Sequence, residues 1–530
     1  MLYEVMPLTT QNNANPVKVL LIGLDGASFN YIKPWVKDSS LPNLAKIIKE
    51  GVSGPLISTI PSVTPPAWTS MLTGTNPGKH GIFHFHDLYA RPQKSIVINA
   101  THQRDLTLWD ILTEVGLPSI FLNVPMTYPP DPINGIMVTG FLTPPTSEDY
   151  IHPQSLRDQI DAMGYQIGQM FGARSHLTYE QIGRHIQART KTAKWLMKNH
   201  EWALFMVVYM ASDGVVHRYP ENPAIIKHVY KLLDTAIGEL IDAAPPNTVV
   251  LVTSDHGIGL LDKQFMINTW LRNHSFLQFR AKPRTVSNKT TKNLLGRIGG
   301  IKPVNRLLHI LPFQLRRKIF RQVVPKYSDI DVTKSLAWGV ASTRNFAFMG
   351  INPSPDKKEL VENLYNKLSQ ITDPRTGQRI VKAVHPSNAL LWGPALEGAP
   401  QIIIETQEDY GIKCGFTHDR NEIRHYTKPL AAHTREGIFL ACGPGIKTQN
   451  PEQFSPLIWD VMPTILQILN VAPPHNLDGR ILHEIFEPDS PFSQEKLQPA
   501  TYRKRQRSRK DLTAEEQKRI TDRLEQLGYM

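Results

Sequence analysis

The 530-residue sequence predicts an α/β fold built on a doubly wound, mostly parallel central sheet with helices on both faces, and with an inserted basic helical segment. Short apolar runs, which are typical of buried parallel strands, alternate along the chain with longer amphipathic segments. Aspartate and histidine residues directly follow several of these runs, at the position where open α/β sheets bind ligands. The chain is long enough to bury a large core, as one unit with an insertion or as two to three domains.

The first strands and helices are predicted between residues 17 and 123. Residues 17–24 (VKVLLIGL) form an apolar run that is too short for a buried helix, so we expect a central strand. Residues 41–50 are amphipathic and stop at a glycine, which predicts a helix returning along the sheet. A helix over 107–114 and a strand over 118–123 repeat this order.

The same alternation continues further along the chain. A helix over 178–199 leads to an apolar strand over 203–209, and a helix over 222–244 leads to a strand over 248–253. A last strand is expected at 437–441. Because strands follow helices throughout, we expect crossover connections and a parallel sheet.

The stretch PSVTPPAW, residues 61–68, predicts the start of a helix. Pro65 suits the first helical position because its missing N–H would have no helical partner, and this makes Thr64 the expected N-cap. A side chain there faces the positive end of the helix dipole, a setting suited to an anion such as phosphate. The alternative is that Thr64 only caps the helix, as most Thr-Pro pairs do.

Acidic and imidazole side chains follow three of the predicted strands and precede the last one. They are Asp25 after 17–24, Asp213 and His217 after 203–209, Asp255 and His256 after 248–253, and His433 ahead of 437–441. The carboxyl ends of parallel strands converge on one edge of a sheet, so these groups form a set of borderline metal ligands. Taken singly, each has another interpretation as a turn residue, a helix cap or a solvated histidine.

The net charge of +12 is concentrated in one segment. Residues 281–328 contain twelve Lys or Arg and no Asp or Glu, which equals the whole surplus. The segment is interpreted as a lid that attracts an anionic substrate, as an attachment to an anionic membrane or another polyanion, or as a solvated cap without a dedicated partner. No motif of a known nucleic-acid module accompanies the charge, and no specific protein partner is inferred.

Two features bear on where the protein works. The chain has only two cysteines, Cys414 and Cys442, which argues against a disulfide scaffold and fits a reducing compartment. The N-terminus lacks a basic start followed by an apolar run, and no stretch reaches the length of a membrane span. We therefore predict a cytoplasmic protein, with peripheral membrane association through the basic segment as an option.

Six motifs together resemble the alkaline phosphatase superfamily, and most closely its type I phosphodiesterase and nucleotide pyrophosphatase branch. They are LIGLDG, PSVTPPAW, GKHGI, SDGVVH, TSDHG and HTREGIF, and they cover about residues 18–269 and 332–482. The resemblance implies a discontinuous catalytic domain of that fold over 17–276 and 332–485. The other segments are a disordered N-terminus (1–16), a basic insertion (277–331), and a basic linker with a C-terminal helix (486–530).

The resemblance also implies the roles of the site residues. One metal would be held by Asp25, Thr64, Asp255 and His256, with Thr64 as the nucleophile, and the second by Asp213, His217 and His433. Zinc is the usual metal in similar enzymes, and manganese is the alternative. The chemistry agrees, because coordination to a divalent cation lowers the pKa of a hydroxyl that is otherwise about 15 to 16.

The implied function is a metal-dependent hydrolase of phosphodiester or pyrophosphate bonds in a small-molecule phosphate ester, working through a phosphothreonine intermediate. The alternatives are a phosphomonoesterase or phosphoryl transferase of the same superfamily, and a non-catalytic binding protein for anionic lipid or nucleic acid. The sequence departs from the family in one place: similar enzymes have an asparagine soon after HGI, whereas this chain continues FHFHD. His84, His86 or Asn123 is expected to contact the phosphate instead.

Overall fold

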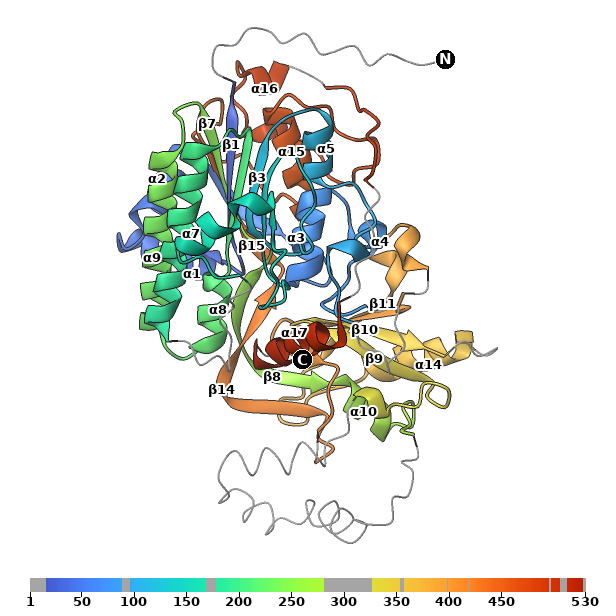
Figure 1. Ribbon diagram of the computed structural model, residues 1–530. Coiled ribbons are helices and arrows are strands. Elements are labelled where there is room, and N and C mark those ends of the chain that lie inside the picture. Colours follow the sequence, from blue (N-terminus) through green and yellow to red (C-terminus); the bar gives the residue numbers. More distant parts are fainter. Residues whose placement is uncertain are drawn as a thin grey trace, which may run out of the picture.

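The computed structural model describes residues 16–87, 96–167, 178–280, 327–352, 357–397, 399–417, 419–494, 497–505 and 512–527. Its core is an eight-stranded sheet of order β2-β15-β7-β1-β6-β3-β4-β5 (Figure 1). The strands are β1 (Lys18–Leu24), β2 (Val52–Ile57), β3 (Ser119–Val124), β4 (Gly135–Thr139), β5 (Ile151–His152), β6 (Leu204–Tyr209), β7 (Thr248–Thr253) and β15 (Glu436–Cys442). The predicted α/β class with a mostly parallel sheet is confirmed.

The centre of this sheet is parallel. β1 pairs with β6 and β7, and β3 pairs with β6 and β4, all in parallel register, while β15 and β5 join antiparallel. Every residue of β3, β6 and β7 is buried. This burial on both faces explains why the strands appear in the sequence as continuous apolar runs.

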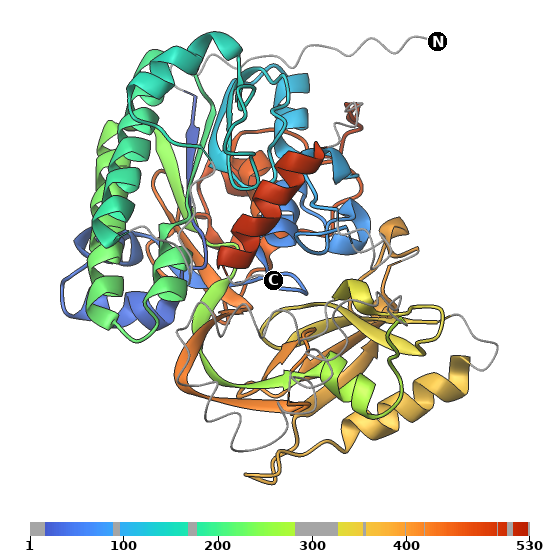
Figure 2. The same cartoon turned by 60° about the horizontal axis from the view of Figure 1, so that its bottom comes forward.

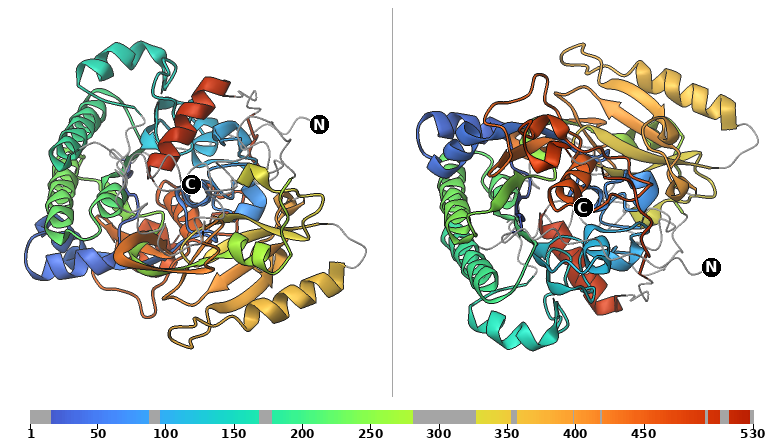
Figure 3. Two further views of the ribbon diagram at one scale, coloured as in Figure 1. Left: turned by 90° about the horizontal axis from the view of Figure 1, so that it is seen from below. Right: turned by 90° about the horizontal axis from the view of Figure 1, so that it is seen from above.

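Helices cover both faces of the sheet (Figure 3). One face shares its apolar core with α3 (Thr64–Thr73), α5 (Leu108–Glu114), α15 (Val461–Ile468) and α17 (Ala514–Leu527). The other face packs against α1 (Phe29–Lys37), α2 (Pro42–Glu50), α7 (Tyr179–Asn199), α8 (Ala211–Arg218) and α9 (Pro223–Ala243). The four helices expected over 41–50, 107–114, 178–199 and 222–244 are found within one residue at each end.

A second body, here called the outer module, lies beyond the carboxyl ends of the core strands (Figures 1 and 2). β8 (Gly257–Met266) leaves the core just after β7, and β14 (Ile423–Thr434) returns antiparallel to it, with β13 (Gly411–Lys413) on the other side of β8. The module also contains an antiparallel sheet of order β11-β12-β10-β9, with α10 (Ile267–Asn273) and α14 (Lys357–Ser369). These four strands are β9 (Ala337–Ser342), β10 (Phe346–Ile351), β11 (Val381–Pro386) and β12 (Ile402–Thr406).

Residues 337–413, within the segment 332–485 of the predicted catalytic domain, build sheets of the outer module together with β8 and β14. Most of the basic insertion (277–331) lies outside the described residues, as does nearly all of the N-terminal segment 1–16. The lid and membrane interpretations of residues 281–328 therefore stay predictions. Among the described helices, none is long and apolar enough to cross a bilayer.

Candidate functional site

Three acidic residues meet at the carboxyl edge of the core sheet. Asp25 follows β1, Asp255 follows β7, and Asp213 lies in the first turn of α8, just after β6. Because β7, β1 and β6 are neighbours in the sheet, their ends deliver these side chains to one place. All three are completely buried. The structure thus brings together the three carboxylates that the sequence singles out.

The first group of side chains consists of Asp25, Asp255 and His256. His256 Nε2 lies 3.2 Å from Asp255 Oδ2 and 4.0 Å from Asp25 Oδ1. The other ring nitrogen, Nδ1, lies 3.0 Å from the carbonyl oxygen of Gly257, which only accepts hydrogen bonds, so Nδ1 carries the proton. Burial lowers the pKa of His256 well below its usual value, so the ring is neutral and Nε2 presents a lone pair to the two carboxylates.

One oxygen of each of these carboxylates is held by a donor, and the other is left for a ligand. Trp68 Nε1 donates to Asp25 Oδ2 at 2.9 Å, and the backbone N–H of Gly26 donates to Asp255 Oδ1 at 3.1 Å. Asp25 Oδ1 and Asp255 Oδ2 are buried and have no hydrogen-bond partner within the described ranges. Burial raises the pKa of both carboxyl groups. Lone pairs that face one another in this way fit a divalent cation bound between them.

The second group consists of Asp213, His217 and His433. His217 lies one turn after Asp213 on α8, and His433 comes from β14, opposite Ile258 of β8. The Nε2 atoms of the two histidines lie 3.4 and 3.3 Å from Asp213 Oδ1 and 3.0 Å from each other. Burial opposes ionisation of Asp213, but the two imidazoles outweigh it and hold the pKa of that carboxyl well below its usual value.

The two groups adjoin. The rings of His256 and His433 stack with their centroids 3.8 Å apart. The chain enters the outer module through β8, directly after His256, and returns through β14, which contains His433. Both groups offer only carboxylate oxygens and imidazole nitrogens, a donor set that suits zinc and manganese. The residues present therefore fit the two divalent ions that the resemblance implies.

Thr64 lies beside the first group, and its predicted capping role is wrong. The N-cap of α3 is Val63, in extended conformation, and its carbonyl oxygen accepts from the N–H of Ala67. Helical backbone therefore begins at Thr64, so its side chain makes no cap hydrogen bond. The buried Thr64 Oγ1 lies 3.5 Å from His256 Nε2 instead. Pro65 and Pro66 carry no N–H, so the start of the helix offers an anion fewer donors than the sequence analysis expects.

The three predicted substrate contacts lie in different settings. Asn123, the penultimate residue of β3, has a positive φ, and its side-chain amide donates to the backbone oxygen of Val208 on β6 at 2.8 Å. Burial lowers the pKa of His84 to about 3, and the charges of His86 and His433 add to this effect. Burial also lowers the pKa of His86 to about 4. A contact of any of the three with phosphate stays a prediction.

Two residues that support the site are missed by the sequence analysis. Trp68 orients Asp25, and its position four residues after Thr64, on the same helix face, is the signal that could have found it. Gly26 has a φ of 65°, and a Cβ there would lie 2.7 Å from Asp213 Oδ1, so only glycine lets the turn after β1 pass so close to this carboxylate.

Removing the indole donor is expected to weaken the first group. Trp68→Phe keeps most of the buried volume but leaves Asp25 Oδ2 without its hydrogen bond, and we expect metal affinity or activity to fall about 10- to 100-fold. Activity assayed at graded metal concentrations measures the loss. Trp109→Phe is the matched control, because Trp109 Nε1 donates to a different buried carboxylate, that of Asp131, at 2.7 Å. Equal losses in both variants would contradict the assigned role of Trp68.

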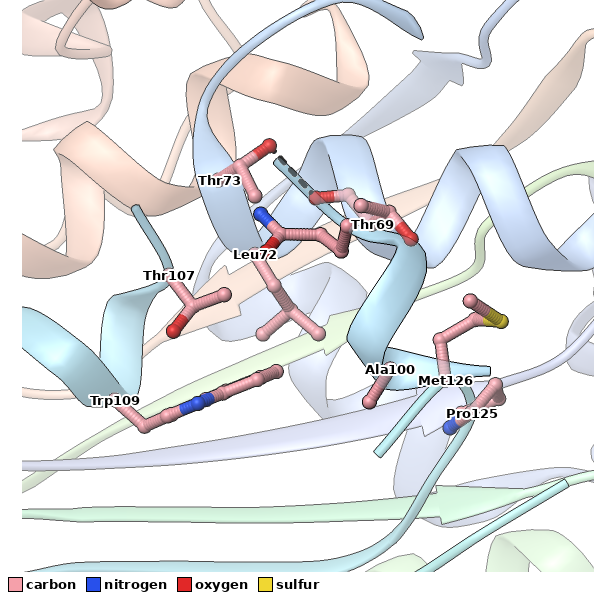
Figure 4. Close-up of a pocket in the computed structure, with 9 residues that line it drawn as sticks. Thr69, Leu72, Thr73, Ala100, Thr107, Trp109, Pro125 and Met126 are labelled. Carbon is pink, nitrogen blue, oxygen red and sulfur yellow. Dashed lines mark hydrogen bonds between the residues drawn. The ribbon is translucent and has the colours of Figure 1, made fainter. Parts of the chain in front are cut away.

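A small cavity beside α3 is separate from the site. It has a volume of about 10 Å³, roughly the room that one water needs, and its lining includes Thr69, Thr73, Trp109 and Met126 (Figure 4). None of the predicted metal ligands or substrate contacts lines it. The cavity therefore does not compete with the strand-end groups as the functional site.

Known proteins resemble this chain in sequence family and in fold. Residues 19–419 match the family model described as type I phosphodiesterase / nucleotide pyrophosphatase. Phosphonoacetate hydrolase from Sinorhizobium meliloti 1021, solved with phosphonoformate, has a similar fold: TM-score 0.56, 14% identity, 86% of this chain and 95% of that chain covered. Murine ectonucleotide pyrophosphatase / phosphodiesterase 5, in an inactive form with AMP, gives a TM-score of 0.50 and 14% identity over 87% of this chain and 97% of that chain. No curated protein matches the chain.

Proposed function

Because this chain belongs to the type I phosphodiesterase / nucleotide pyrophosphatase family of the alkaline phosphatase superfamily, it is a phosphoester hydrolase, and we propose that Thr64 is its nucleophile. The observation that carries this proposal is the position of Thr64 Oγ1, 3.5 Å from His256 Nε2 and free of any capping hydrogen bond. This buried hydroxyl contacts a proposed metal ligand, a position from which it could share the metal and act as the nucleophile.

Asp25, Asp255 and His256 would hold one divalent ion together with Thr64, and Asp213, His217 and His433 would hold the other. The family depends on divalent metals, and we propose zinc, because imidazole makes up three of the six donors in these two groups. Bound ions would lower the pKa of the Thr64 hydroxyl and neutralise the charge on the phosphoryl oxygens.

The reaction then proceeds in two displacements at phosphorus. The Thr64 oxygen forms a bond to phosphorus as the bond to the leaving oxygen breaks, and the proton of the hydroxyl is lost to solvent. The intermediate is Thr64 esterified to the phosphoryl group, which in a diester still carries its second ester. Water attacks the same phosphorus from the side that the leaving group vacated, and the Thr64 oxygen departs and regains a proton. The carboxylates and imidazoles of the two groups are fixed by the fold, so they would not need to rearrange between the first displacement and the second.

Hydrolysis of bis-p-nitrophenyl phosphate, compared with p-nitrophenyl phosphate, tests the bond type. We expect metal-replete protein to turn over the diester faster, with no turnover after treatment with a chelator. Faster turnover of the monoester would replace the proposal by a phosphomonoesterase. No turnover of either ester by protein that holds its metals would indicate a phosphoryl transferase or a narrow substrate range, and absence of both metal and turnover would indicate a binding protein.

A further inference from the structure

Two arginines from distant parts of the chain act on one histidine beside the catalytic edge of the core. His185 and Arg189 lie one turn apart on α7, and the charge of Arg523, on α17, acts on His185. Figures 2 and 3 show α17 on the side of the core that faces the carboxyl ends of the strands. We call His185, Arg189 and Arg523 the arginine cluster.

The charges of Arg189 and Arg523 are not compensated by a carboxylate within the described parts of the chain. Arg189 is only 4% exposed and its Nε has no hydrogen-bond partner there, and no ion pair joins Arg189 or the half-buried Arg523 to a carboxylate. Burial lowers the pKa of Arg523 to about 10, which still leaves the group charged at neutral pH. Burial lowers the pKa of His185 to about 4, and neighbouring arginines add to the effect.

A second buried donor lies against Arg189. The guanidinium carbon of Arg189 is 5.7 Å from the centroid of the Tyr165 ring, and the buried Tyr165 hydroxyl has no hydrogen-bond partner other than Arg189 among the described residues. Burial raises the pKa of Tyr165, so this hydroxyl keeps its proton and can donate. Buried donors and an unpaired guanidinium are costly to maintain, and the group that satisfies both is an anion with several oxygens, such as phosphate or carboxylate.

The cluster is connected to the catalytic edge through β6. Thr190, next to Arg189, forms a 2.8 Å hydrogen bond between its hydroxyl and that of Tyr209. The backbone oxygen of Tyr209 in turn accepts from the N–H of Asp25 at 2.9 Å. The cluster therefore lies at the same end of the sheet as the metal groups, on the α7 side.

We propose that the arginine cluster binds a non-reacting anionic group of the substrate, so that the enzyme prefers phosphoesters that carry a second phosphate or carboxylate. This inference rests on the proposed function for the reacting centre. The anion would be held by Arg189 and Tyr165 from the core and by Arg523 from α17, away from the phosphorus that Thr64 attacks.

Binding to Thr64→Ala protein tests the cluster without turnover. Carboxyethyl p-nitrophenyl phosphate and ethyl p-nitrophenyl phosphate differ only in a distal carboxylate, and calorimetry gives their dissociation constants. We expect the carboxylate ester to bind about 10- to 100-fold more tightly than the ethyl ester. Arg189→Met or Arg523→Met should remove most of this difference by weakening binding of the carboxylate ester, with little change in the dissociation constant of the ethyl ester. Arg189→Lys is expected to restore part of it, because charge is kept and the fork geometry is lost.

Two control variants distinguish a specific effect of the arginine cluster from a general effect of removing positive charge. Arg519→Met removes an arginine of α17 that pairs with Glu515, and Lys194→Met removes a lysine of α7 that pairs with Glu239. Both are expected to keep the full advantage of the carboxylate ester. An equal affinity of wild-type cluster for the two esters, or an advantage that survives both Arg189→Met and Arg523→Met, would overturn the proposal. If the carboxylate advantage depends on the cluster but protein with Thr64 intact hydrolyses neither ester, the proposed function fails and the anion site stands.

Discussion

Thr64→Ala is expected to reduce turnover of phosphodiesters by at least about 10⁴-fold at saturating metal, where Asp25, Asp255 and His256 still suffice to hold the first ion. The hydroxyl is the only oxygen of this side chain and lies at the edge of the first group, 3.5 Å from His256 Nε2. Initial rates with bis-p-nitrophenyl phosphate measure the loss. A Thr64→Ala rate within tenfold of the wild type would contradict a covalent role for this residue.

Two observations make this variant easy to interpret. Thr64 makes no cap hydrogen bond, so its removal should not unravel α3, and the thermal unfolding midpoint is expected to change little. Thr64→Ser keeps a hydroxyl at the same position and is the matched control, for which we expect a measurable rate. A serine variant as inactive as the alanine variant would indicate that the methyl group, and hence packing, accounts for the loss.

A variant that lacks one proposed ligand of either group is expected to lose the metal ion of that group. Asp255→Asn affects the first group and His433→Ala affects the second. Each variant is expected to bind one divalent ion per chain, and the wild type is expected to bind two. Activity is expected to fall at least about 10³-fold in both, because each displacement at phosphorus needs both positive charges. Metal analysis of the purified proteins measures the content directly.

The control for this pair is another buried carboxylate. Asp234 is 2% exposed and accepts hydrogen bonds from the backbone of Asn43 and Leu44, away from both groups. Asp234→Asn should keep two ions per chain. A wild type that binds a single ion, or single-group variants that lose both ions, would show that the groups are not two independent metal sites.

Much of the core and the positions of the strand-end Asp and His side chains could be predicted because both depend on local sequence. A buried parallel strand such as β7 is an uninterrupted apolar run, and it was assigned within the same bounds, Thr248–Thr253. Asp255 and His256 follow it directly, so their position at the sheet edge comes with the strand. The convergence of Asp25 and Asp213 on the same place then requires only that β1, β6 and β7 be neighbours.

The features that the sequence analysis missed depend on contacts between distant segments. The sheet of β9 to β12 consists of strands of five or six residues whose partners are set by tertiary packing, and no motif marks them. The start of α3 shifts by one residue because Val63, rather than Thr64, adopts the extended N-cap conformation. The effect of Arg523 on His185 joins two helices more than three hundred residues apart, which one sequence cannot reveal.

The stereochemical course at phosphorus tests the central claim most directly. A phosphorothioate diester of known configuration is hydrolysed in isotopically labelled water, and the configuration of the product is determined. Two in-line displacements, the first by Thr64 and the second by water, each invert the centre, so the account predicts overall retention. Inversion would show that water attacks the substrate directly, and would contradict Thr64 as the nucleophile.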